Sequence, residues 1–93
     1  MIIVTLTFKK TMPEIFAKLD EHNIFLDNFF AKNKFLASGL LEDKSGGIIL
    51  VMSDSIEEAQ SIMQKDPFYI HDLVDFEYTF FAATKLSSSL SHK

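Results

Sequence analysis

The stretch Lys18–Phe30, "KLDEHNIFLDNFF", carries the pattern on which both the fold and the candidate site depend. Together with the preceding turn, it holds a row of four apolar side chains and one histidine at intervals of four, three, four and three residues. This spacing is typical of one face of an α-helix. The row consists of Ile15, Leu19, His22, Leu26 and Phe29. We therefore predict a helix that lies against a sheet, with a histidine in the middle of its buried face.

Length, composition and charge argue against several classes of protein. Ninety-three residues, of which 47% are apolar and 24% charged, are typical of one globular domain. The formal net charge of −4 argues against nucleic-acid binding, which requires a basic face. No apolar run approaches the roughly 20 residues of a membrane span, the first residues lack the features of a signal peptide, and there is no cysteine. We expect a cytoplasmic protein that binds neither nucleic acid nor membrane.

The rest of the chain switches between strand and helix patterns. Alternating or continuous apolar runs predict strands over residues 2–8, 35–42, 48–52 and 73–83, and helical spacing predicts helices over 12–31 and 56–64. The stretches Thr11–Glu14 and Ser55–Glu58 have the spacing of capping boxes, and Asn33 suits a left-handed helix end. The order βαββαβ indicates the α+β class and a ferredoxin-like sandwich, in which two helices cover one face of a four-stranded antiparallel sheet.

The other face of this sheet should be covered as well. We expect apolar side chains there in each strand, and a second copy of the chain would be the simplest cover. A homodimer packed sheet to sheet is therefore predicted, and the exposed helix face at Ile24 and Phe25 offers a further surface for association. Residues 1–84 should form the domain, and the polar residues 85–93 a frayed tail.

The sequence lacks the common motifs of cofactor and metal sites. There is no glycine-rich phosphate loop, no metal-ligand spacing of histidine and cysteine, and no nucleophile elbow. A single histidine supplies no distinctive arrangement for haem or flavin. We expect no metal and no cofactor.

His22 and Asp66 each allow two interpretations. His22 is either a packed core histidine or a general acid/base, because its side chain titrates near neutral pH. Asp66 either satisfies N–H groups of the loop after the second helix, or accepts a hydrogen bond from the His22 ring and sets its tautomer. Phe68 is a core residue or a wall of a substrate pocket, and His71 a solvated residue or a third polar group of that pocket. The local sequence does not decide between these alternatives.

The order of several short motifs resembles the YciI-like (YCII-related) family over residues 2–81. The matching features are a histidine on the first helix, a small residue and glycine on the second strand, a glycine opening the third, an acidic helix start, and an Asp-Pro-aromatic tripeptide. In this chain they are His22, Ser38–Gly39, Gly47, Glu57–Ala59 and Asp66–Phe68.

This resemblance implies a dimeric α/β barrel built from two ferredoxin-like subunits. It also implies His22 and Asp66 as a catalytic pair beside a pocket, where we take Ser38, Gly39 and Phe68 as substrate-binding residues. We expect a small cofactor-free enzyme that performs lyase- or isomerase-like acid/base chemistry on a small organic substrate. The alternative is a non-catalytic dimeric module that binds a small molecule or has a structural role.

Overall fold

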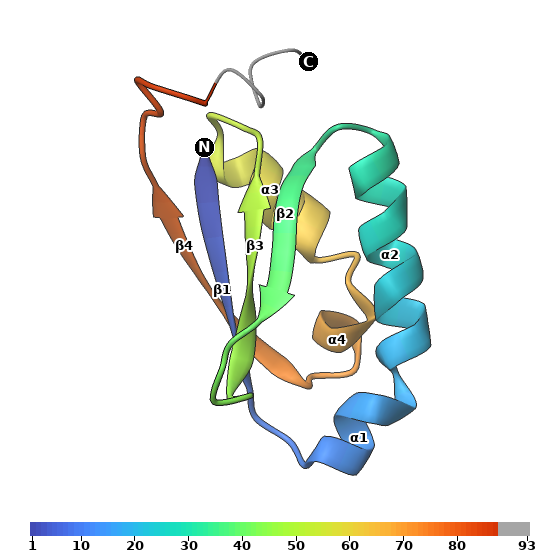
Figure 1. Ribbon diagram of the computed structural model, residues 1–93. Helices are drawn as coiled ribbons and strands as arrows, with labels where there is room; N and C mark the ends of the chain where they lie inside the picture. Colours follow the sequence, from blue (N-terminus) through green and yellow to red (C-terminus); the bar gives the residue numbers. More distant parts are fainter. Residues whose placement is uncertain (88–93) are drawn as a thin grey trace.

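The computed structural model describes residues 1–87, which form one antiparallel sheet with helices on one side (Figure 1). The structure divides the predicted first helix into two and adds a short helix after the second, and the remaining elements are those predicted. In chain order the elements are β1 (Ile2–Phe8), α1 (Met12–Ala17), α2 (Leu19–Ala31), β2 (Phe35–Leu40), β3 (Gly46–Val51), α3 (Ile56–Met63), α4 (Pro67–Ile70) and β4 (Val74–Phe80).

The sheet confirms the predicted ferredoxin-like topology. Its strand order is β2-β3-β1-β4, and every neighbouring pair is antiparallel. The central strand β1 pairs with β3 from Ile2 opposite Val51 and with β4 from Ile2 opposite Phe80. Because side chains alternate along a strand, Ile2, Val4 and Leu6 all point to the helix-covered face, where they are buried.

The first helix differs from the prediction, because it is broken at Lys18. This residue has φ −113° and ψ 6°, so the chain ends α1 there and begins α2 with a changed direction. In the first turn of α1, the Glu14 carboxylate accepts hydrogen bonds from the backbone N–H and the hydroxyl of Thr11. These two bonds, the backbone one above all, lower the pKa of Glu14. The start of the helix was therefore readable from the sequence, whereas the break was not.

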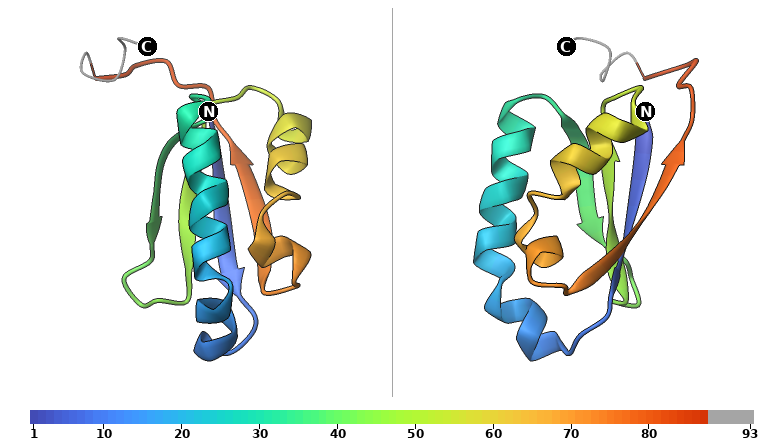
Figure 2. Two further views of the ribbon diagram at one scale, coloured as in Figure 1. Left: turned by 90° about the vertical axis from the view of Figure 1, so that its right-hand side faces the viewer. Right: turned by 180° about the vertical axis from the view of Figure 1, so that it is seen from behind.

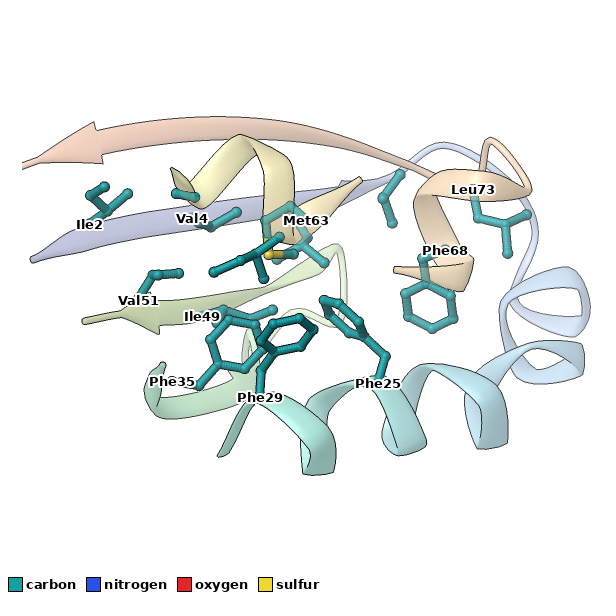
Figure 3. Packing of buried hydrophobic residues seen from close by; sticks show 14 of the residues in the cluster. Ile2, Val4, Phe25, Phe29, Phe35, Ile49, Val51, Met63, Phe68 and Leu73 are labelled. Carbon is teal, nitrogen blue, oxygen red and sulfur yellow. The ribbon is translucent and has the colours of Figure 1, made fainter. Parts of the chain in front are cut away.

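The break changes which side chains the helix buries. Ile15, His22 and Phe29 are buried as expected, but Leu19 and Leu26 are only partly buried. Phe25, which we expected on an exposed face, is instead 6% exposed and packs against the rings of Phe29 and Phe35. Ile24 is exposed as expected. Figure 3 shows Phe25, Phe29 and Phe35 grouped beneath the sheet, with Phe68 and Leu73 farther along.

The connection between β2 and β3 is shifted by two residues toward the N-terminus relative to the prediction, because β2 ends at Leu40 and β3 begins at Gly46. Gly46 lies opposite Thr7, and a Cβ atom there would overlap the Leu6 carbonyl oxygen. Only glycine lets the β1 and β3 backbones approach this closely.

A short helix that the sequence analysis did not include, α4, follows α3. Asp66 has extended backbone angles and caps α4, because its carboxylate accepts the Phe68 N–H. The segment ends at His71, and Asp72 with φ 59° leads into β4. Since α4 contacts both α2 and β4, it fills the space between them and brings the Asp-Pro-Phe tripeptide against α2.

The opposite face of the sheet carries no helix among the described residues (Figure 2). Strand alternation places the partly buried Ile3, Ile48 and Leu50 on it. The expectation of apolar residues in every strand is wrong for β4, whose outward residues are polar: Asp75, Glu77 and Thr79.

Residues 81–87 form neither helix nor strand, and residues 88–93 of the predicted tail lie outside the described residues, so the division at residue 84 stays a prediction. None of the helices over residues 1–87 is long and apolar enough to cross a membrane.

Candidate functional site

A cavity of about 380 Å³ lies where α1, α2 and α4 meet the β2–β3 end of the sheet. Its walls are mostly apolar, with a few polar groups among them. The lining residues are Leu6, Phe8, Met12, Ile15, Phe16, Leu19, His22, Asn23, Leu26, Ser38, Gly39, Leu40, Lys44, Gly47, Ile48, Ile49 and Phe68. Leu19 and Leu26 face this space, which explains why the two predicted core residues are only partly buried.

His22 borders the cavity and is held from behind by Asp66. The ring Nδ1 lies 2.8 Å from Asp66 Oδ1, and the Asp66 side chain is 0% exposed. The same oxygen accepts the Phe68 N–H at 2.9 Å. An ionised carboxylate only accepts hydrogen bonds, so beside an ionised Asp66 the neutral ring carries its proton on Nδ1 and its lone pair on Nε2.

The side chain of Phe68 fixes the plane of the imidazole. Its ring stacks on that of His22 with centroids 4.0 Å apart and an angle of 7° between the planes. Phe8 in turn contacts Phe68 edge to face at 6.1 Å. With one face against Phe68 and Nδ1 bonded to Asp66, the His22 ring has little freedom to rotate.

Nε2 is the ring atom left for the cavity. Among residues 1–87 this nitrogen has no hydrogen-bond partner. It is also not fully buried, since Asp66 Oδ2 is the one fully buried polar side-chain atom without a partner in this part of the chain. Since the His22 side chain retains 10% exposure and lines the cavity, this nitrogen is reachable from there. A base of this geometry needs a substrate proton within hydrogen-bond reach of Nε2.

Asp66 Oδ2 is buried and has no hydrogen-bond partner within the described chain. Buried polar atoms are normally paired, so an unpaired carboxylate oxygen calls for an explanation. The other oxygen, Oδ1, carries both hydrogen bonds of this carboxylate, one with the His22 ring and one from the Phe68 N–H.

Four of the five predicted site residues line this cavity, and the fifth, Asp66, contacts the His22 ring from behind. His22 and Asp66 are in contact, Phe68 stacks on the ring, and Ser38 and Gly39 line the wall on β2. Their proximity is observed, and their roles remain predictions. His71 is exposed at the end of α4 and does not line the cavity, which agrees with the solvated interpretation.

Sequence reasoning missed other lining residues, among them Asn23, Lys44 and the rim residue Phe16. Asn23 directly follows His22 and Lys44 lies in the "DKSGG" turn, so neither sits in a motif that singles it out. Phe16 and Leu40 are 64% and 59% exposed, which marks an apolar rim that the apolar pattern alone does not reveal.

A comparison with known protein families shows the family to which this chain belongs. The YCII-related domain matches residues 1–79. The chain belongs to the YCII-related family. The resemblance drawn from the motifs is thereby confirmed. A comparison of this YCII-related chain with curated proteins finds no match.

A solved structure has the same fold as this YCII-related chain. It is 5-chloro-2-hydroxyhydroquinone dehydrochlorinase from Burkholderia phenoliruptrix, in complex with 2,5-dihydroxybenzoquinone. The two superimpose with a TM-score of 0.69 over 88% of this chain and 94% of the other, at 17% sequence identity. At this identity the likeness supports the fold alone.

Proposed function

We propose that this YCII-related protein is a small cofactor-free enzyme in which His22 is the general acid/base and Asp66 its positioning residue. The observation that carries the proposal is an imidazole that lines a cavity, stacks on Phe68 and has its Nδ1 bonded to a buried carboxylate. This is the arrangement in which a third group orients a catalytic base.

The chemistry that suits one imidazole is proton transfer on a small organic molecule. Nε2 takes a proton from an O–H group, or from a C–H group next to a carbonyl, and the substrate keeps the bonding electron pair. That pair then expels a leaving group from a neighbouring carbon, or moves so that a proton returns at another carbon. The first outcome is a lyase reaction and the second an isomerisation, and neither requires an oxidant.

The cavity and the structural neighbour favour a single-ring substrate. About 380 Å³ is near the lower end of small-molecule sites, which span roughly 300–1,000 Å³. The walls are mostly apolar, with Ser38 and His22 among the polar groups that would orient a ligand. The neighbour is a dehydrochlorinase whose structure holds a hydroxylated quinone, so this compound class is the first to test.

A second candidate function is a non-catalytic dimeric module. One observation favours it: the Asp66 carboxylate also caps α4, so the pair ties α2 to α4 whether or not any reaction occurs. In that role the protein binds a small molecule without converting it, or holds none. Turnover that depends on His22 would exclude it.

A homodimer and a cytoplasmic location accompany the proposal. The helix-free face with Ile3, Ile48 and Leu50 supports pairing of two sheets, because a small domain gains stability by covering such a surface. The cytoplasmic location rests on the sequence and stays a prediction.

Activity of a matched pair of histidine variants tests the enzyme. The protein is offered hydroxylated and chlorinated hydroquinones, beginning with 5-chloro-2-hydroxyhydroquinone, and chloride release and quinone absorbance are recorded. His22→Asn should lower kcat/KM by about 10²–10⁴-fold, the usual contribution of a positioned acid/base. His71→Asn, at the exposed histidine outside the cavity, should leave it unchanged. Equal activity of His22→Asn and the unmodified protein on a turned-over substrate would refute the proposal.

A further inference from the structure

One cation borders the cavity and has no part in the proton transfer described above. Lys44 lies on the turn between β2 and β3 and lines the cavity. Among residues 1–87 no acidic side chain lines the cavity, since Asp66 lies behind the His22 ring and is fully buried. The cavity therefore offers an anion a cationic group and no repelling carboxylate on its walls.

The Lys44 ammonium is not used elsewhere in residues 1–87. The ion pairs of lysine there involve Lys9, Lys18 and Lys34, and no side-chain hydrogen bond of Lys44 is present. Its neighbour Asp43 is already engaged, because its carboxylate accepts the N–H and hydroxyl of Ser45. Lys44 is thus free to pair with a ligand.

The backbone at Lys44 is one that side chains disfavour. Its φ is 62°. The Lys44 N–H donates to the Leu41 carbonyl, and the Leu41 N–H donates to the Gly46 carbonyl. This is a hairpin turn followed by a left-handed residue, a position where glycine is preferred. Strain that persists beside a cavity motivates a hypothesis of function there.

We propose that the cavity binds small planar ring compounds that carry an anionic group, and that Lys44 pairs with this group and determines specificity. The exposed rim residues Phe16 and Leu40 supply apolar walls for the ring, and Lys44 lies on the same turn side of the sheet. The inference rests on the proposed function only in taking this cavity as the substrate site; it does not require that His22 be catalytic.

Two probes of nearly the same shape, one anionic and one neutral, test it by NMR titration: 2,5-dihydroxybenzoate and 2,5-dihydroxybenzamide. The protein should bind the benzoate up to about fivefold more tightly, since a solvent-accessible ion pair contributes about 0.2–1 kcal/mol. The difference should shrink in about 0.5 M NaCl because salt screens the pair. Lys44→Gln and Lys44→Gly should abolish it.

Control variants separate a binding role from a structural one. Lys85→Gln makes the same charge change on an exposed lysine that follows β4 in the chain. The end of β4 pairs with Ile2, so it lies at the opposite end of the sheet from the β2–β3 turn that holds Lys44. It should keep the preference for the benzoate. Lys44→Gly should also raise the melting temperature, because glycine adopts φ 62° without strain.

Three results would overturn the inference. They are equal affinity for the two probes, a preference that survives in both Lys44 variants, and no binding of either probe at the cavity. Failure of the proposed enzyme gives a different pattern: the benzoate preference depends on Lys44, but His22→Asn leaves turnover unchanged.

Discussion

Replacing Asp66 by alanine and by asparagine separates its structural role from its chemical role. Asp66 Oδ1 is the acceptor for both the Phe68 N–H and the His22 Nδ1–H, at 2.9 and 2.8 Å, within a fully buried site. Alanine leaves both donors buried without an acceptor. Each such donor costs about 1–3 kcal/mol, so Asp66→Ala should lower the free energy of unfolding by roughly 2–6 kcal/mol. The loss of the α4 cap adds nothing to this estimate, because the cap is the same hydrogen bond from the Phe68 N–H.

Asparagine keeps an oxygen at the acceptor position and removes only the charge. A hydrogen bond to a charged group is worth about 1.5–3 kcal/mol and a neutral one about 0.5–1.5, so Asp66→Asn should cost roughly 1–2 kcal/mol. The same loss applies to the imidazolium that forms during proton transfer. Activity of Asp66→Asn should therefore fall about 5- to 30-fold, while most of its stability remains.

Urea unfolding followed by circular dichroism measures the stabilities, and steady-state kinetics the activities. In a domain of this size, 1 kcal/mol shifts Tm by roughly 4–8 °C, so the alanine variant should melt about 10 °C or more below the unmodified protein. Asp20→Ala, at an exposed aspartate of α2, should stay within about 0.5 kcal/mol. The reasoning is refuted if Asp66→Ala is as stable as Asp20→Ala, or if Asp66→Asn keeps full activity.

Three further predictions concern the rest of the fold. The Lys34 ammonium, 2.8 Å from the Glu58 carboxylate, holds the pKa of Glu58 below its usual 4.5. The contribution of Glu58 to stability is therefore complete above that pH and is lost as the pH falls below it. Glu58→Gln should remove part of the acid dependence of unfolding, and an unchanged pH profile would contradict this. Leu50→Lys on the helix-free face should turn a dimer into a folded monomer by light scattering, whereas an unmodified protein that is already monomeric would disprove the sheet-to-sheet dimer. Phe25→Ala should lower the free energy of unfolding by about 3–5 kcal/mol, and Ile24→Ala, on the exposed side, by less than about 0.5; similar losses would argue against the observed packing.

The sequence predicted those parts of the fold that depend on local signals. Strand alternation, the caps at Thr11 and Ser55, and the left-handed Asn33 are set by nearby residues, and the structure has all of them. At the second cap, Ser55 accepts the Glu58 N–H, but the Glu58 side chain accepts from Ser53 and Lys34 instead of returning to Ser55. The reciprocal half of that capping box is therefore wrong.

The features that were missed depend on contacts between distant residues. The break at Lys18 and the four-residue α4 have weak local signals and are held by the packing of α1 and α4 around α2. In the site, residue types marked His22 and Asp66, but they are 44 positions apart and only the fold shows their contact. The stacking of Phe68 and the position of Lys44 at the cavity likewise follow from tertiary structure.

The measurement that tests the central claim most directly is which nitrogen of the His22 ring carries the proton. Long-range ¹H–¹⁵N NMR of the neutral imidazole identifies which nitrogen carries it, and the exposed His71 in the same spectrum serves as the internal reference. The Asp66 contact predicts that Nδ1 is protonated and that Nε2 keeps its lone pair toward the cavity, and that addition of 2,5-dihydroxybenzoquinone shifts the Nε2 resonance. A proton on Nε2, or an Nε2 resonance indifferent to cavity ligands, would contradict a base that is oriented by Asp66 and acts on a bound substrate.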